Sequence, residues 1–340
     1  MSTPSRPATI KTIAADTGYS IATVSRALSG SDALKSTTRE AIKEAAERLG
    51  YQQDRTAVRL KTGRTQVVAF ILNREDQSHA FARLMLLGMT DALKESGYHV
   101  IIIPEQAQES PLDTVRFVVE QRAADGLILT HTLPEDPRVA YLTEQDIPFV
   151  THGRTLMNSR HAYVDFDNES FAYQATRALI QKGREQICLI PAPCHQSYRE
   201  HIITGYQRAI TEANLPSHIV HELDLNAAPE ALEKLVLSQI GQTDAYVVPQ
   251  ENAALPVIST LQRQGYRIGS DIDVAVKQVT SMTDYLNLPL LRCRENLQAA
   301  AQTMARQLLT QMNPNRFPAL SSGQHVLQPA TLEVFPYEPA

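Results

Sequence analysis

The sequence lacks the signals of several common classes of protein. No apolar run approaches the ~20 residues that a membrane span needs. The longest clean run, Val67 to Leu72, has the length of a strand. The first residues show no charged-then-apolar secretory pattern. The three cysteines (Cys188, Cys194, Cys293) are too widely spaced for a disulfide framework or a metal site, so we expect reduced thiols in a cytoplasmic protein.

Motifs of the common enzyme classes are also missing. The sequence contains no phosphate-binding loop of the form GxxxxGK[ST] or GxGxxG and no GxSxG nucleophile elbow. The ten histidines form no HExxH pattern, and His218 and His221 fall in a predicted strand far from any cysteine. We therefore expect no catalytic residue, no metal and no cofactor. Turnover of sugars by the core would revive the enzyme hypothesis.

Charge is distributed unevenly along the 340 residues. Residues 1–64 contain 11 Lys and Arg against 6 Asp and Glu, a net charge of +5; since the whole chain has −5, the remainder has −10. A basic N-terminal segment on an otherwise acidic chain indicates contact with a polyanion such as DNA. A chance variation of charge along the chain would explain the same pattern equally well. The length exceeds one compact domain of usual size and indicates two or three.

The first fifty residues predict three short helices. Thr9 can cap the first and Gly18 can end it. After a tight turn, Ser20 can cap a second helix that runs from Ile21 to about Leu28. The third helix is expected to open with a capping box formed by Thr37 and Glu40. Its buried apolar stripe is expected to consist of Ile42, Ala45, Ala46 and Leu49.

Two short helices across a tight turn, braced by a third, form a helix-turn-helix, whose second helix enters the major groove of DNA. Arg26 can donate two hydrogen bonds to guanine, and Ile21 and Ala22 can contact thymine methyl groups. Candidate DNA-binding residues in this segment are Thr9, Ser20, Ile21, Ala22, Thr23, Ser25 and Arg26. From these residues alone, a plain three-helix bundle with a surface arginine is equally acceptable.

Residues 52–66 are expected to form a hinge between this domain, at 1–51, and the rest of the chain. The segment is polar and basic and has one isolated leucine, Leu60. Residues 56–60 could form a helix, but one so short is marginal in water. Ala57 and Leu60 would share one face of it. Leu60 then either contacts DNA or packs on the core.

Beyond the hinge, apolar strands alternate with amphipathic helices, the pattern of doubly wound parallel sheets. Strands are expected at 67–72, 99–103, 126–130, 148–151, 162–166, 187–190, 219–223, 245–248 and 273–276, and helices at 80–96, 111–122, 168–182, 199–213, 229–239, 251–264 and 295–311. The core, 67–340, is large for one sheet, so we expect two lobes. Lobe one covers about 67–166 with 293–320; lobe two covers about 167–292 with 321–340, where the tail 324–338 adds a final strand. Ligands of such folds bind in the cleft between lobes.

Three ungapped runs, Ile10–Ala14, Thr23–Gly30 and Thr38–Tyr51, resemble the headpiece of the LacI/GalR family of bacterial transcription regulators. The resemblance implies DNA binding in the bacterial cytoplasm, at the nucleoid, with Ile21, Ala22 and Arg26 reading bases. It also implies that the hinge folds on DNA, with Ala57 on its contact face and Leu60 wedged into the minor groove. Gln53 stands where relatives often have proline, so the entry to the hinge is expected to be looser.

Four segments of the core (125–128, 163–168, 183–184 and 205–206) resemble the family's effector domain, which is similar to periplasmic sugar-binding proteins. The resemblance implies a small-molecule effector, a sugar or sugar derivative, in the cleft. Lys277, in place of an acidic neighbourhood, leaves room for a ligand with a carboxylate or phosphate. Candidate effector-binding residues, each of which could equally have an ordinary structural role, are Asn73, Phe81, His131, Asp167, Tyr198, Arg199, Gln250 and Glu251.

The sequence therefore predicts a repressor that binds a pseudo-palindromic, double-stranded operator as a homodimer, without a membrane. The chain ends without a leucine heptad, which favours a dimer over a tetramer. A binding module for transport has the same core, but the headpiece and the missing signal peptide disfavour it. The effector, the operator, repression or activation, and the direction of the effector's action on DNA stay open.

Overall fold

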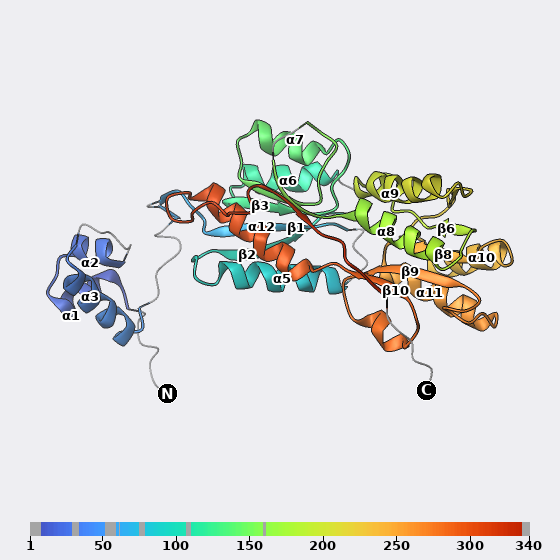
Figure 1. Ribbon diagram of the computed structural model, residues 1–340. Coiled ribbons are helices and arrows are strands. Elements are labelled where there is room, and N and C mark those ends of the chain that lie inside the picture. Colours follow the sequence, from blue (N-terminus) through green and yellow to red (C-terminus); the bar gives the residue numbers. More distant parts are fainter. Residues whose placement is uncertain are drawn as a thin grey trace. The chain divides into compact units, whose positions relative to one another are not determined.

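The computed structural model describes residues 8–28, 34–51, 59–60, 62–74, 79–106, 110–158 and 161–334. The chain divides into two compact units, Met1–Thr65 and Gln66–Ala340 (Figure 1). Most of the expected hinge, including Ala57, lies outside the described residues, as do Ser29 and Gly30, which directly follow the expected second helix. None of the helices in the described ranges is long and apolar enough to cross a bilayer.

The first unit contains the expected helices α1 (Ile10–Thr17), α2 (Ile21–Leu28) and α3 (Ser36–Arg48). The side chain of Thr9 caps α1, and Gly18 ends it with a φ of 73°, a left-handed conformation that glycine adopts without steric cost. The Ser20 hydroxyl accepts a hydrogen bond from the Thr23 N–H at 3.1 Å, as expected of an N-cap. The three helices bury a small common core made of Ile13, Val24, Ala27, Ile42, Ala45 and Ala46.

The expected start of the third helix is wrong. Helix α3 begins at Ser36 with Lys35 at the N-cap, and no side chain there makes a capping hydrogen bond. Thr37 therefore lies within the first turn, where it cannot form the expected capping box with Glu40. An ion pair between Arg48 Nη2 and Asp16 Oδ2, 2.6 Å long, joins α3 to α1 at the surface.

The second unit contains two six-stranded sheets. The first has the order β11-β5-β4-β3-β1-β2, and its neighbouring strands pair in parallel. Helices α5 and α12 cover one face and α6 and α7 the other (Figure 1). The bounds are β1 Val67–Leu72, β2 His99–Pro104, β3 Gly126–Leu129, β4 Phe149–His152, β5 Ala162–Phe166, β11 His325–Gln328, α5 His79–Leu93, α6 Pro111–Glu120, α7 Pro137–Glu144 and α12 Leu297–Met312.

The second sheet has the order β12-β10-β9-β8-β6-β7, with β12 antiparallel to β10. Helices α8 and α9 pack together on one side, and α10 and α11 on the other (Figure 1). The bounds are β6 Ile187–Leu189, β7 His218–Ile219, β8 Ala245–Val248, β9 Asp273–Gln278, β10 Leu291–Arg294, β12 Leu332–Val334, α8 Asn168–Gln181, α9 Tyr198–Glu212, α10 Pro229–Gln239, α11 Glu251–Arg263 and the 3₁₀ helix η1 Met282–Leu286.

Two expectations about the lobes need correction. Residues 321–340 do not all belong to the second lobe, because β11 joins the first sheet and only β12 joins the second. Residues 293–294 do not belong to the first lobe, because they end β10 in the second sheet. Pro329 follows β11 directly and cannot donate a backbone hydrogen bond, so the tail is interrupted there and changes sheets. Helix α12 returns to the first sheet as expected.

The chain passes between the two sheets at three places: after β5, after β10 and after β11. Gln328, at the end of β11, connects these three crossings. Its carbonyl oxygen accepts a hydrogen bond from the Asp167 N–H at 2.9 Å, and its side-chain amide donates to the carbonyl of Asn296 at 3.4 Å. The three crossings therefore lie side by side.

Gly205 and Tyr206, which belong to the family-like segments, have distinct packing roles. A Cβ at Gly205 would lie 2.1 Å from the carbonyl oxygen of Glu169, so only glycine allows α9 to approach α8 this closely. Tyr206 is buried beside the glycine, and its hydroxyl donates to the carbonyl of Ile187 at 2.7 Å and accepts from the His218 N–H at 2.9 Å. The pair thus fixes α9 against α8 and the second sheet.

Candidate functional site

The exposed face of α2 presents the side chains that were expected to read bases. Ile21 is 51% exposed, and Ala22 and Arg26 are exposed beside it. The Arg26 Nε–H donates to the carbonyl of Ala22 at 3.3 Å, which lays the arginine along this face. Val24 and Ala27 hold the opposite face of α2 in the helical core.

The other candidate DNA-binding residues have separate local roles. The Thr9 hydroxyl accepts from the Thr12 N–H at 3.3 Å, and the hydroxyls of Ser20 and Thr23 lie 2.8 Å apart at the start of α2. Ser25 is half-buried. Leu60 is 85% exposed within the described structure.

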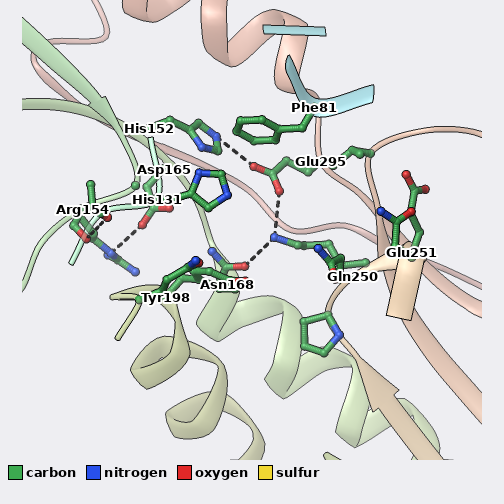
Figure 2. Close-up of a pocket in the computed structure, with 17 residues that line it drawn as sticks. Phe81, His131, His152, Arg154, Asp165, Asn168, Tyr198, Gln250, Glu251 and Glu295 are labelled. Atoms are coloured by element: carbon green, nitrogen blue, oxygen red, sulfur yellow. Dashed lines mark hydrogen bonds and ion pairs between the residues drawn. The ribbon is translucent and has the colours of Figure 1, made fainter. Parts of the chain in front are cut away.

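A cavity of about 870 Å³, part of it open to solvent, lies in the second unit at the carboxyl ends of strands from both sheets (Figure 2). Strands β3, β4 and β5 lead into it from the first sheet, and β8, β9 and β10 from the second. It is lined by Phe81, His131, Thr132, His152, Gly153, Arg154, Asp165, Asn168, Gln196, Tyr198, Pro249, Gln250, Glu251, Asn252, Lys277, Val279 and Glu295.

Five of the eight candidate effector-binding residues line this cavity: Phe81, His131, Tyr198, Gln250 and Glu251. The other three lie outside the lining. The Asn73 amide donates to Glu105 Oε2 at 2.9 Å. Asp167 is the N-cap of α8, and its Oδ1 accepts from the Ser170 N–H at 2.9 Å. Arg199 donates to the carbonyl of Ala192.

Several charged and polar lining residues were not among the candidates: His152, Arg154, Asp165, Asn168, Gln196, Lys277 and Glu295. His152 and Arg154 lie at the carboxyl end of an expected strand, where ligands of doubly wound folds bind, so the sequence could have indicated them. Glu295 follows β10, a strand that the sequence pattern did not predict.

Glu295 lies between two basic side chains from different sheets. Its Oε1 is 3.1 Å from His152 Nε2, and its Oε2 is 2.9 Å from the ammonium of Lys277 (Figure 2). The same ammonium donates to Asn168 Oδ1 at 3.0 Å. Burial alone would raise the pKa of Glu295, but Lys277 and His152 lower it to about 2, so this side chain is ionised at neutral pH.

A second ion pair and a neutral histidine complete the polar lining. Arg154 Nε lies 3.1 Å from Asp165 Oδ2, and burial raises the pKa of Asp165 to about 6 although His152 and Arg154 oppose this. Burial, with the charges of His152 and Arg138 acting in the same direction, lowers the pKa of His131 to about 3. The neutral His131 ring packs edge-on against Phe81, with centroids 5.4 Å apart.

A buried arginine supports the loop that presents His131. Arg138, which is 1% exposed, forms ion pairs with Glu105 at 2.8 Å and with Asp136 at 2.7 Å. Its Nη2 also donates to the carbonyls of Thr130 at 3.2 Å and His131 at 3.0 Å. His131 has a φ of 52°, in the left-handed region that residues other than glycine adopt uncommonly, so these bonds help to hold it.

Comparisons with known proteins agree with this division into two units. A family model described as "Bacterial regulatory proteins, lacI family" matches residues 9–54. A second model, described as "Periplasmic binding proteins and sugar binding domain of LacI family", matches residues 65–317.

Similar proteins carry regulator names. The HTH-type transcriptional regulator AglR of Rhizobium meliloti (strain 1021) is 29% identical over 314 residues, which cover 89% of this chain and 87% of AglR. The HTH-type transcriptional regulator CelR of Thermobifida fusca is 28% identical over 313 residues, which cover 89% of this chain and 92% of CelR. None of these descriptions names an enzyme.

Solved structures share the fold. A complex of the transcriptional regulator CelR with cellobiose has a TM-score of 0.70 and 24% identity, covering 97% of this chain and 99% of the other. The Lac repressor dimer bound to operator and the anti-inducer ONPF has a TM-score of 0.78 and 19% identity, covering 97% and 98%. With a helix-turn-helix domain and a sugar-binding domain both matched, this chain belongs to the LacI family of bacterial regulatory proteins and is a DNA-binding transcription regulator, not an enzyme.

Proposed function

We propose that this regulator is a repressor that binds a pseudo-palindromic, double-stranded operator as a homodimer and responds to a sugar or sugar derivative bound in the cavity. The observation that supports it most is the cavity itself, which is built from the strand ends of both sheets and bridged by Glu295. A ligand there contacts both lobes and can therefore favour one arrangement of them over another. The described complex of CelR with cellobiose supports a carbohydrate effector.

The DNA-binding part of the proposal rests on two exposed side-chain sets. The face of α2 that carries Ile21, Ala22 and Arg26 offers apolar contacts and a bidentate donor to the major groove. Leu60, exposed and apolar, suits a minor-groove wedge, in which unstacking of base steps is offset by added protein contacts.

Dimerisation is supported by apolar side chains along one edge of the first sheet. Strand β2 is the edge strand, and Ile102 on it is exposed. Leu87 on α5 and Phe117 on α6 are also exposed. Since α5 and α6 cover opposite faces of this sheet, both flanks of the edge offer apolar contact to a second copy.

A two-fold dimer predicts a two-fold binding site, because each headpiece reads one half of the operator. Selection of binding sequences from random DNA, followed by footprinting, should yield two inverted half-sites that are protected together. Size measurement of the complex should give two chains per site. A single asymmetric half-site protected by one chain would contradict the proposed homodimer on a pseudo-palindrome.

Replacing Arg26 by alanine tests base reading by α2. If the guanidinium pairs with guanine, the change should weaken operator binding by about 1–3 kcal/mol and binding to random DNA much less. Fluorescence anisotropy at fixed salt measures both affinities. Lys43→Ala, which removes the same charge from an exposed position on α3, is the matched control. Equal losses on operator and random DNA would show that Arg26 contacts only phosphate.

A further inference from the structure

The ionised side chains that line the cavity are already engaged with other protein groups. Lys277 pairs with Glu295, and Arg154 lies against Asp165. The third carboxylate, Glu251, accepts from both the N–H and the hydroxyl of Thr280, at 3.2 and 3.0 Å. A ligand anion would therefore have to compete with a carboxylate of the protein for either cation.

The charge balance of the lining also opposes an anion. Two cations, Lys277 and Arg154, face three carboxylates, and His131 is neutral. A phosphate or carboxylate on the ligand would add negative charge to a partly buried site in which every cation is already paired. The resulting electrostatic repulsion is stronger there than in water.

One buried polar group in the lining lacks a hydrogen-bond donor. Gln196 is 2% exposed, and its Oε1 has no hydrogen-bond partner within the part of the chain that the structure describes. A buried acceptor left without a donor is unfavourable. A sugar hydroxyl can donate to this oxygen, and sugars of any charge carry such hydroxyls, so Gln196 favours a hydroxyl-bearing ligand without setting its charge. The rings of Phe81 and Tyr198 add apolar faces beside these polar groups.

We infer that the cavity takes an uncharged sugar and discriminates against sugar phosphates and sugar acids, with Glu295 as the residue that sets this preference. By occupying Lys277 and His152, Glu295 withholds the two basic groups that an anionic ligand would use. The inference also assigns Gln196 as the acceptor of a sugar hydroxyl, a requirement that does not depend on the charge of the ligand. This inference rests on the proposed function and narrows its effector class.

The first test compares matched ligands on the full-length protein. Thermal shift and calorimetry would be run with neutral mono- and disaccharides, their 6-phosphates, the corresponding uronic acids and the amino sugars. We expect binding by one or more neutral sugars and at least about tenfold weaker binding by each 6-phosphate and uronic acid. Preference for a phosphate, an acid or an amino sugar would overturn the inference and leave a sugar effector in place. Absence of binding by every sugar would overturn both.

The second test changes the preference. Glu295→Gln keeps the size of the side chain but leaves Lys277 and His152 without their carboxylate partner, so it should improve binding of the 6-phosphate relative to its neutral parent by about tenfold or more. Glu222→Gln, at an exposed position outside the lining, is the control. An unchanged ratio in a folded Glu295→Gln protein would remove Glu295 from this role.

A variant of Gln196 tests the hydroxyl-acceptor part of the inference independently of position 295. Gln196→Leu removes the unpaired buried acceptor, so the free protein should fold at least as well as the parent. Its affinity for the neutral sugar should nevertheless fall by about tenfold, because the hydroxyl loses its acceptor. Unchanged sugar affinity in this variant would show that the ligand does not donate to Gln196 and would count against the inference.

Discussion

Arg138→Met is expected to lower the free energy of unfolding of the core by about 3–5 kcal/mol, the usual effect of breaking a buried ion pair from one side. Methionine keeps most of the length of the side chain but removes its charge and donors. Glu105 and Asp136, whose side chains are 3% and 0% exposed, would then be buried without their cation. Urea denaturation followed by circular dichroism measures the change.

An exposed ion pair in the second lobe provides the control. Arg267 pairs with Asp271 at 2.8 Å, but its side chain is 76% exposed. Arg267→Met should therefore have little measurable effect on unfolding. If Arg138→Met were no more destabilising than this control, the ion pairs of Arg138 with Glu105 and Asp136 would not stabilise the loop that presents His131. Since Arg138 also holds the carbonyl of His131, sugar affinity should fall in any Arg138→Met protein that remains folded.

Leu60→Ala should leave dimerisation and effector affinity unchanged but remove DNA bending and most of the operator affinity. A small side chain cannot separate base steps, so the contacts that depend on the kink are lost. The remaining affinity should respond little to effector if the hinge couples the two ligands. Gel mobility of circularly permuted operator fragments measures bending, and anisotropy with and without sugar measures coupling.

Leu156→Ala is the matched control, because Leu156 is also an exposed leucine but lies in the second unit. It should bend and release the operator as the parent does. Normal bending and full effector response in Leu60→Ala would show that the coupling runs through other residues and that the hinge only tethers the headpiece. Loss of effector binding in Leu60→Ala would instead point to damage within the core.

The sequence predicted the helices and strands whose position and bounds depend only on residues within the element or next to it. Thr9, Gly18 and Ser20 act locally, through backbone groups within a turn, and the bounds of α2 are as expected. The expected β1, β5 and β8 are apolar runs buried in the sheets, and their bounds are also as expected. Such features require no knowledge of distant partners.

Strand β10 shows why other elements could not be predicted. Its residues alternate between apolar and basic side chains, yet Arg292 is buried. It is accommodated because its guanidinium lies 3.0 Å from Asp284 and donates to the carbonyl of Leu288 at 2.9 Å. Hydrophobic periodicity cannot reveal a buried cation, whose partners are known only after folding.

The cavity was predictable in place but not in its chemistry. The rule that ligands bind at the carboxyl ends of parallel strands placed Phe81, His131, Tyr198, Gln250 and Glu251 together. Asp167, however, is held by the Ser170 N–H as a helix cap, and Asp165 lines the cavity instead. Lys277 pairs with Glu295, 18 residues away in sequence, and Arg138 pairs with Glu105, 33 residues away, and no sequence pattern marks such pairs.

The three crossings joined by Gln328 also restrict the mechanics of the core. Two lobes joined by a single segment can rotate about three independent axes. When several connecting segments lie side by side, only rotation about one axis remains easy. The hydrogen bonds of Gln328 to Asp167 and Asn296 hold the crossings together, so twisting of one lobe against the other must strain them. We therefore expect the two lobes to move relative to each other by rotation about a single hinge axis. Different ligands in the cavity can set its angle at different values, but all of them act along the same coordinate.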